Sequence, residues 1–225
     1  MSEWWTYAPS DFLMFSPRVY YRLFESYNLS FWPVAVVSLA LGVAIFLLLL
    51  RPTRAGHRII LAILGVLWIF VAWAFFWERY ASINWGAAYV APVFGLQAIA
   101  LMWTSAVRGK TKFVATRALP DVVALALFLF SVIGYPFVAA VMGRPWLSAE
   151  IFGLAPDPTA LATLALLALA HGGMRWPLLI IPLLWCLLSG LTLWTMEAGD
   201  FFVAPVGALS AMAIAVIRAR RQSRT

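Results

Sequence analysis

The sequence predicts an all-α fold: a polytopic membrane bundle of seven transmembrane helices, preceded by an interfacial amphipathic helix. Hydrophobic residues make up 64% of the 225-residue chain and charged residues only 11%, with a mean hydropathy of +0.91. A soluble domain carries about 25% charged residues. Apolar runs of about 20 residues, the length that spans a bilayer, recur along the whole chain. Most charges lie between these runs.

Residues 1–30 are expected to form a separate interfacial segment, because they are aromatic and amphipathic rather than continuously apolar. A serine–proline pair at Ser16 is a favourable helix start, with serine as N-cap and proline at the first helical position. Val19, Leu23 and Tyr27 then share one face, as in a helix that lies on a membrane surface. An arm that docks in a groove of a partner protein is the alternative.

A transmembrane domain is predicted for residues 31–217, followed by a basic tail at 218–225. The fifth of its apolar segments has 13 residues, about 20 Å of helix against a hydrocarbon core of about 30 Å. We expect it to cross as a short, recessed helix, because the Arg-rich C-terminus would otherwise lie on the acidic side. The seven segments are Phe31–Leu50, Ile59–Trp77, Trp85–Ala106, Pro120–Met142, Pro158–Ala170, Pro177–Met196 and Phe201–Ile217.

The charges of the loops predict the orientation of the chain. Twelve of the 16 basic residues follow odd-numbered segments, whereas eight of the nine acidic residues lie at the opposite side. Because positive loops stay in the cytoplasm, the N-terminus is expected outside and the C-terminus inside. Basic residues placed in this way serve as topology signals, so nucleic acid is not an expected partner. The expected partner is instead the lipid bilayer.

The start of the fifth segment is the most informative stretch. Asp157 followed by Pro158 predicts an N-cap and a first helical residue. A helix this short cannot place both ends in water, so we expect the loop 144–156 to dip into the membrane and meet it. A carboxylate at that depth needs a partner, and Arg144 and Trp146 are the nearest basic and aromatic candidates in sequence.

Aromatic residues are concentrated in the predicted outer halves of the helices. An interfacial belt explains this pattern, and so does an outward-facing, aromatic-lined cavity. Three prolines in the outer thirds of their segments favour the cavity, since bends at one depth splay the helix ends. The candidate ligand-binding residues are Trp73, Trp77, Glu78, Gln97, Tyr135, Arg144, Trp146, Glu150 and Asp157.

Motifs for catalysis and metal binding are missing from the sequence. His57 and His171 lack partners at metal-binding spacings, Cys186 is the only cysteine, and no nucleophile–base pair is apparent. We therefore predict no metal ligand and no catalytic residue, and the sequence indicates no cofactor. Spanning segments without lysine exclude a retinal Schiff base.

The leading functional hypothesis is binding or transport of a small apolar or cationic solute. Trp73, Trp77 and Tyr135 would form the walls of the cavity by stacking and cation–π contact. Gln97 would supply a hydrogen bond at depth, and acidic residues at the rim would attract a cation. The alternatives are a non-catalytic accessory or assembly subunit, docking a membrane protein or a second copy, and, more weakly, a membrane-embedded enzyme.

Three stretches give the chain a resemblance to a family: SDFLMFSPRVYYRLFE, FGLAPDPT and the turn GYPFVAAVMGRPW. The chain resembles, over nearly its whole length, an uncharacterised bacterial multi-pass family known as a domain of unknown function. The resemblance implies a bacterial inner-membrane protein. It implies no activity, cofactor or site residue.

Overall fold

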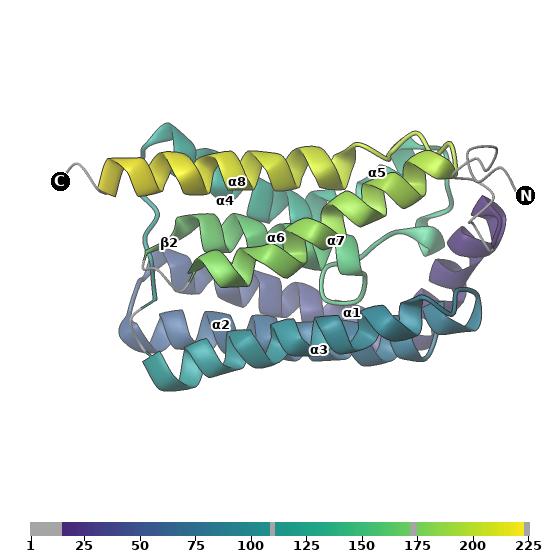
Figure 1. Ribbon diagram of the computed structural model, residues 1–225, viewed down its shortest axis with the longest axis horizontal. Helices are drawn as coiled ribbons and strands as arrows, with labels where there is room; N and C mark the ends of the chain where they lie inside the picture. Colours follow the sequence, from purple (N-terminus) through teal and green to yellow (C-terminus); the bar gives the residue numbers. More distant parts are fainter. Residues whose placement is uncertain (1–14, 109–110, 172–174, 223–225) are drawn as a thin grey trace, which may run out of the picture.

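The structure, a computed structural model, describes residues 15–108, 111–171 and 175–222, which form a helical bundle (Figure 1). Residues 1–14 of the predicted interfacial segment and 223–225 of the predicted tail lie outside the described part. In chain order the elements are α1 (Pro17–Leu50), α2 (Arg54–Phe70), η3 (Val71–Trp77), η4 (Tyr80–Ser82), α3 (Ala87–Trp103), η5 (Thr104–Arg108), β1 (Lys112–Phe113), α4 (Leu119–Leu129), η6 (Phe130–Gly134), α5 (Pro136–Val141), η7 (Trp146–Ser148), α6 (Pro156–Leu169), β2 (Ala170–His171), α7 (Arg175–Thr195) and α8 (Val203–Gln222).

Several of these helices have the length and composition of membrane spans. Two further apolar helices, Leu119–Gly134 and Pro156–Leu169, are shorter. The chain is therefore a helical protein suited to a membrane, as its composition predicts. Among the described residues, the five helices long and apolar enough to cross a membrane are Pro17–Leu50, Arg54–Ser82, Ala87–Ala106, Arg175–Thr195 and Val203–Arg221.

Helix α6 lies at the centre of the bundle. All 14 of its residues are buried, and it contacts α4, α7 and α8. Figure 1 shows it between α8 and α4 on one side and α1, α2 and α3 on the other. Its alanine, leucine and threonine side chains are small enough for helices to pack on every face. A helix enclosed by other helices does not need the length of one that faces lipid.

The start of α6 differs from its prediction. The helix begins at Pro156, and its N-cap residue, Ala155, makes no side-chain hydrogen bond. The prediction that Asp157 caps the helix is therefore wrong, since Asp157 lies inside the first turn and its carboxylate is directed to neighbouring helices. Thr159 instead ties the preceding loop to α6, because its Oγ1 accepts a hydrogen bond of 2.8 Å from the Gly153 amide.

Helix α1 begins as predicted and bends once. The Ser16 side chain accepts a hydrogen bond from the Val19 amide, which confirms the predicted N-cap. Phe31 has non-helical backbone angles (φ −117°, ψ 20°). It lies two residues before Pro33, whose ring removes one backbone donor and crowds the preceding turn. The bend separates the first turns of α1 from its long apolar part.

The first turns of α1 pack against protein. Leu23 and Tyr27 are buried against protein, whereas Val19 is 42% exposed on the protein surface. The buried face is rotated towards Tyr20 and Phe24. Their rings lie 5.9 Å and 5.2 Å from those of Tyr80 and Phe75, respectively.

The bundle has two ends, named here by the helices that mark them. The α1 end, on the right in Figure 1, holds the start of α1, η4, η7 and the turn between α7 and α8. The α8 end, on the left, holds the last turns of α8 and the antiparallel pair β1–β2, in which Lys112 faces His171. A buried carboxylate lies near each end.

Candidate functional site

Asp157 is the buried carboxylate nearer the α1 end. It is 1% exposed, yet three side chains donate hydrogen bonds to it. The Trp185 indole Nε1 donates to Oδ1 at 2.7 Å, and the Ser189 hydroxyl donates to Oδ2 at 2.6 Å. The Tyr135 hydroxyl donates to Oδ2 at 3.3 Å. These four residues are called the Asp157 cluster.

The Asp157 cluster is built from three helical segments. Trp185 and Ser189 are four residues apart on α7, so they project from one face towards α6. Tyr135 follows the π-helical turn η6 and directly precedes Pro136, the first residue of α5. The carboxylate thus links α6, α7 and the η6–α5 junction.

The charge of Asp157 is held by neutral groups only. All three donors are uncharged, and no described arginine, lysine or histidine forms an ion pair with it. Its place in the first turn of α6 adds the favourable field of the helix N-terminus. Such a site stabilises an anion without cancelling its charge, so it keeps an attraction for a cation.

Glu150 is a second buried acid at the same end. It is 5% exposed, and its Oε2 has no hydrogen-bond partner. Burial, and after it the negative charge of Asp157, raise the pKa of the Glu150 carboxyl well above its usual range. Glu150 and Asp157 therefore interact electrostatically, and a proton is favoured on Glu150.

The loop that carries Glu150 is fastened to α1. The Asn28 amide Nδ2 donates to the carbonyls of Leu147 and Ala149 at 2.7 and 2.8 Å. The Tyr27 hydroxyl donates to the Leu154 carbonyl at 3.3 Å. These three bonds satisfy loop carbonyls that secondary structure leaves unpaired. They hold the loop over the start of α6.

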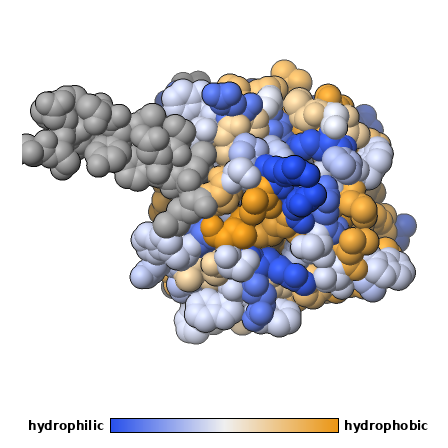
Figure 2. All heavy atoms as spheres, turned by 90° about the vertical axis from the view of Figure 1, so that its right-hand side faces the viewer, coloured by the Kyte–Doolittle hydropathy of each residue, from blue (hydrophilic) through white to orange (hydrophobic). Residues whose placement is uncertain are grey.

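Arg144 and Trp146 do not hold Asp157, so their predicted pairing with it is wrong. Arg144 forms an ion pair with Asp200, and its guanidinium lies 4.2 Å from the centre of the Tyr21 ring. Trp146 is 57% exposed and packs edge-on against Phe137. Tyr135, Trp185 and Ser189 hold Asp157 instead. Figure 2 shows hydrophilic and hydrophobic residues side by side across this end of the molecule.

Trp73 and Trp77 line a different part of the surface. Both belong to η3 and are more than half exposed, and Glu78, which follows η3, is exposed as well. The two indoles border a shallow pocket of about 440 Å³ between η3 and α3, with Ala91, Pro92 and Gly95 among its other walls. The structure thus separates these aromatic residues from the Asp157 cluster.

A second groove, between α3 and α7, lies against the Asp157 cluster. Its volume is about 230 Å³, and its lining is almost entirely apolar. Trp185 forms part of its wall together with Phe94, whose ring centre is 5.4 Å from that of Trp185. The same indole donates to Asp157, so one side chain separates this groove from the buried charge.

Gln97 lies on α3, the helix shared by both grooves. It is 1% exposed, and its Nε2 donates a hydrogen bond of 2.9 Å to the Leu178 carbonyl. Leu178 is four residues before Pro182, which has no amide hydrogen to donate to that carbonyl. Gln97 therefore supplies the donor that the proline removes and joins α3 to α7.

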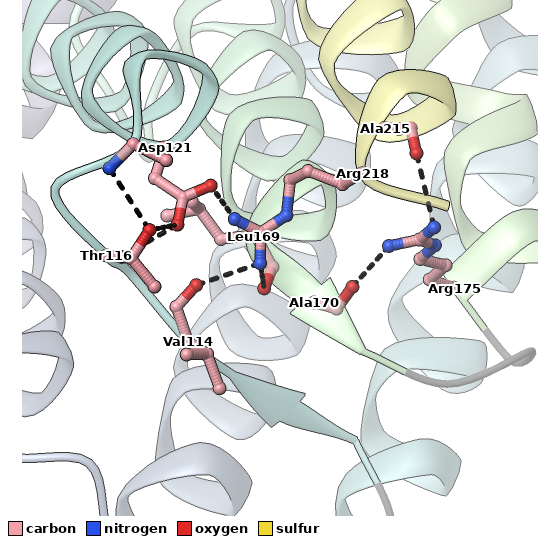
Figure 3. Close-up of polar contacts among 9 residues, drawn as sticks. Val114, Thr116, Asp121, Leu169, Ala170, Arg175, Ala215 and Arg218 are labelled. Carbon is pink, nitrogen blue, oxygen red and sulfur yellow. Dashed lines mark hydrogen bonds and ion pairs between the residues drawn. The ribbon is translucent and has the colours of Figure 1, made fainter. Parts of the chain in front are cut away.

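Asp121 is the buried carboxylate of the α8 end (Figure 3). It is 3% exposed and forms an ion pair with Arg218 of α8. Its Oδ2 also accepts hydrogen bonds from the Thr116 amide at 2.7 Å and hydroxyl at 2.6 Å. Arg218 in turn donates to the carbonyls of Val114 and Leu169. Asp121, Thr116 and Arg218 are called the Asp121 cluster.

The C-terminal end of α6 is satisfied by arginines. Arg175 donates to the Ala170 and Ala215 carbonyls, as Arg218 does to that of Leu169 (Figure 3). Leu169 and Ala170 lie at the end of α6, where carbonyls lack intrahelical partners, whereas Ala215 lies inside α8. The charge of Asp121 is therefore compensated by Arg218, and both oxygens of the carboxylate have partners.

Comparison with known proteins places the chain in a family. The sequence matches the family of unknown function DUF6064 over residues 17–225. The chain belongs to this family. The resemblance inferred from the sequence is thus confirmed, and membership brings no known activity. No curated protein and no solved structure matches the chain.

Sequence reasoning identified Asp157 and Tyr135 but missed their companions, and it missed the Asp121 cluster. Trp185 and Ser189 stand in an apolar run and carry no motif. The available signal was their spacing, since a hydroxyl and an indole four residues apart share one helical face. For Asp121 the signal was a lone acid on a side otherwise crowded with arginine.

Proposed function

We propose that this DUF6064 chain binds a small apolar or cationic solute within the membrane, either to recognise it or to transport it. The observation that supports this most is the state of Asp157. The carboxylate is buried and meets only neutral donors among the described residues, and Trp185 separates it from an apolar groove. A cation with an apolar surface fits both features, since it gains from the groove and from the charge.

The proposal includes the other residues predicted for the site. Glu150 adds a second acid beside Asp157, and Glu78 adds an exposed charge near the indole-lined pocket. Trp73 and Trp77 offer faces for stacking or cation–π contact. The two grooves flank α3, so we infer that the solute approaches from the lipid side.

The membrane setting is part of the proposal. We infer seven passes, with the five long helices and the two shorter ones all crossing a bacterial inner membrane. Loop charge supports placing the α8 end in the cytoplasm, since that end carries most of the arginines. Reporters fused after Thr225 and in the loop 144–157 test this, and reporters on the same side would contradict it.

Binding is tested with a pair of ions that have the same shape and opposite charge. Tetraphenylphosphonium is an apolar cation, and tetraphenylborate is its anionic counterpart. Purified protein in neutral detergent should be stabilised against heat by the cation and not by the anion. The stabilisation should disappear in Asp157→Asn and persist in Glu197→Gln, which removes an exposed acid at the same end. Equal effects of both ions on the wild type would contradict the proposal.

A further inference from the structure

A small pocket opens beside the Asp121 cluster at the α8 end. Its volume is about 160 Å³, and it lies between the first turn of α4, β2 and the last turns of α8. Thr116, Asp121, His171, Arg218 and Arg221 contribute its polar lining. A water molecule takes up about 30 Å³ in the liquid, so the pocket holds a group the size of a tetrahedral oxyanion.

The charges around this pocket do not balance. Asp121 is the one acid in its lining, and Arg218 and Thr116 already satisfy that acid. Arg221 is exposed, and the described part of the chain offers it no partner. The pocket therefore carries an excess of positive charge.

Two nitrogen atoms at the pocket lack partners. His171 Nδ1 and Arg218 Nε are both buried and make no hydrogen bond within the described residues. Arg218 is 7% exposed, so its side chain is held firmly in place. Buried polar atoms without partners are uncommon in folded proteins, and both of these belong to residues that line the pocket. Arg218 Nε can only donate, so a ligand that accepts hydrogen bonds would give it a partner.

The backbone around the pocket also favours an anion. The pocket borders the start of α4, whose N-cap residue is Ala118. A helix N-terminus attracts negative charge. A cation would meet Arg218 and Arg221 and only one acid, which is already paired.

We propose that this pocket binds a phosphate group, with Arg221 and His171 as its contacts and Arg218 as a fixed positive wall. Phosphate supplies negative charge and several acceptor oxygens, which are what the pocket lacks. The group comes either from the headgroup of an anionic phospholipid or from a free phosphate. Basic pockets between transmembrane helices commonly bind lipid headgroups in this way.

The experiment uses the full chain and two phosphate sources. In one arm, protein in neutral detergent is titrated with inorganic phosphate, with chloride at matched ionic strength as the control. In the other, protein is reconstituted in phosphatidylcholine alone or in an equal mixture with phosphatidylglycerol. Retained phosphatidylglycerol is counted by native mass spectrometry. Arg221→Gln and His171→Gln are compared with Arg51→Gln, which removes an exposed arginine at the same end.

Binding of either probe should weaken about tenfold in Arg221→Gln and His171→Gln, as expected for loss of one hydrogen bond to a charged group. Arg51→Gln should bind like the wild type. Binding of phosphatidylglycerol alone assigns the pocket to a lipid, and binding of inorganic phosphate assigns it to a soluble ligand. The proposal is overturned if neither probe binds, or if the pocket variants behave like Arg51→Gln.

Discussion

Each end of the bundle buries an aspartate, Asp157 at the α1 end and Asp121 at the α8 end, and the two carboxylates are stabilised by different partners. Asp121 and Asp157 each lie in the first turn of a helix and directly follow a proline, and both are almost completely buried. Asp121 meets a guanidinium, whereas Asp157 meets an indole, a hydroxyl and a phenol. One charge is cancelled by a cation and the other is held only by dipoles.

This difference separates a structural charge from an available one. The Arg218–Asp121 pair joins α8 to α4, and the same arginine binds the carbonyl end of α6. Removal of Arg218 should therefore disturb the fold. Asp157 also joins helices, but its charge has no counter-ion among the described residues. That carboxylate can attract a cation without first giving up another.

The largest expected effect is at Arg218. Arg218→Met leaves Asp121 buried without a cation and removes the hydrogen bonds to Val114 and Leu169. Breaking one side of a buried pair costs about 3–5 kcal/mol of unfolding free energy. Thermal unfolding in detergent should show a large loss of stability for Arg218→Met and a negligible loss for Arg221→Gln, which changes an exposed residue. Similar losses in the two variants would mean that Arg218 is not buried as described.

The next effect is at Asp157. Asp157→Ala leaves the Trp185 indole without its acceptor, at about 1–3 kcal/mol, whereas the hydroxyls of Ser189 and Tyr135 can rotate. Asp157→Asn keeps an oxygen for Trp185, and the Ser189 hydroxyl can turn to accept from the new amide, so its loss should be much smaller. Thermal unfolding of both variants decides this. Equal stability of the two would contradict the hydrogen-bond network.

A smaller effect depends on pH and involves Glu150. Its pKa is raised in the folded chain, so above the ordinary value of about 4.3 the folded state holds a proton that the unfolded state has lost. Stability should therefore fall as pH rises from there towards the folded pKa, with a limiting slope of about 1.4 kcal/mol per pH unit.

Glu150→Gln should remove this component and leave a flatter pH profile of the melting temperature. A profile parallel to that of the wild type would show that Glu150 titrates normally in the folded chain.

The smallest effect is expected at Ser189. Ser189→Ala removes one of two donors to Asp157 Oδ2 and leaves that oxygen with the longer bond from Tyr135. The expected loss is about 1 kcal/mol. Ser210→Ala is the matched control, since Ser210 is half-buried on α8 and its hydroxyl bonds only to its own helix. If both variants lose the same stability, the hydroxyl of Ser189 contributes nothing specific.

Much of the fold follows from hydropathy, because an apolar run of sufficient length forms a helix in a membrane. The run Pro158–Ala170 predicted a short helix, and α6 is a short helix that is buried on every side. The Ser16 cap was also predictable, since it depends on neighbours in sequence. The start of α6 was not, because Pro156 and Pro158 both suit a first turn and tertiary contacts decide between them.

The partners of the buried acids lay beyond sequence reasoning. Trp185 is 28 residues from Asp157, and Arg218 approaches Asp121 from the last helix of the chain. Hydropathy identifies which segments are helical but not which helices become neighbours. Proximity in sequence suggested Arg144 for Asp157, and the structure pairs that arginine with Asp200 instead.

Titration calorimetry with tetraphenylphosphonium on Asp157→Asn and Asp121→Asn tests the contrast between the two acids most directly. Both variants remove one buried carboxylate charge and keep the shape of the side chain. We predict that Asp157→Asn loses cation binding while remaining folded, and that Asp121→Asn is less stable but binds the cation like the wild type. Equal loss of cation binding in both variants, or retained cation binding in Asp157→Asn, would contradict the claim that Asp157 is the available charge.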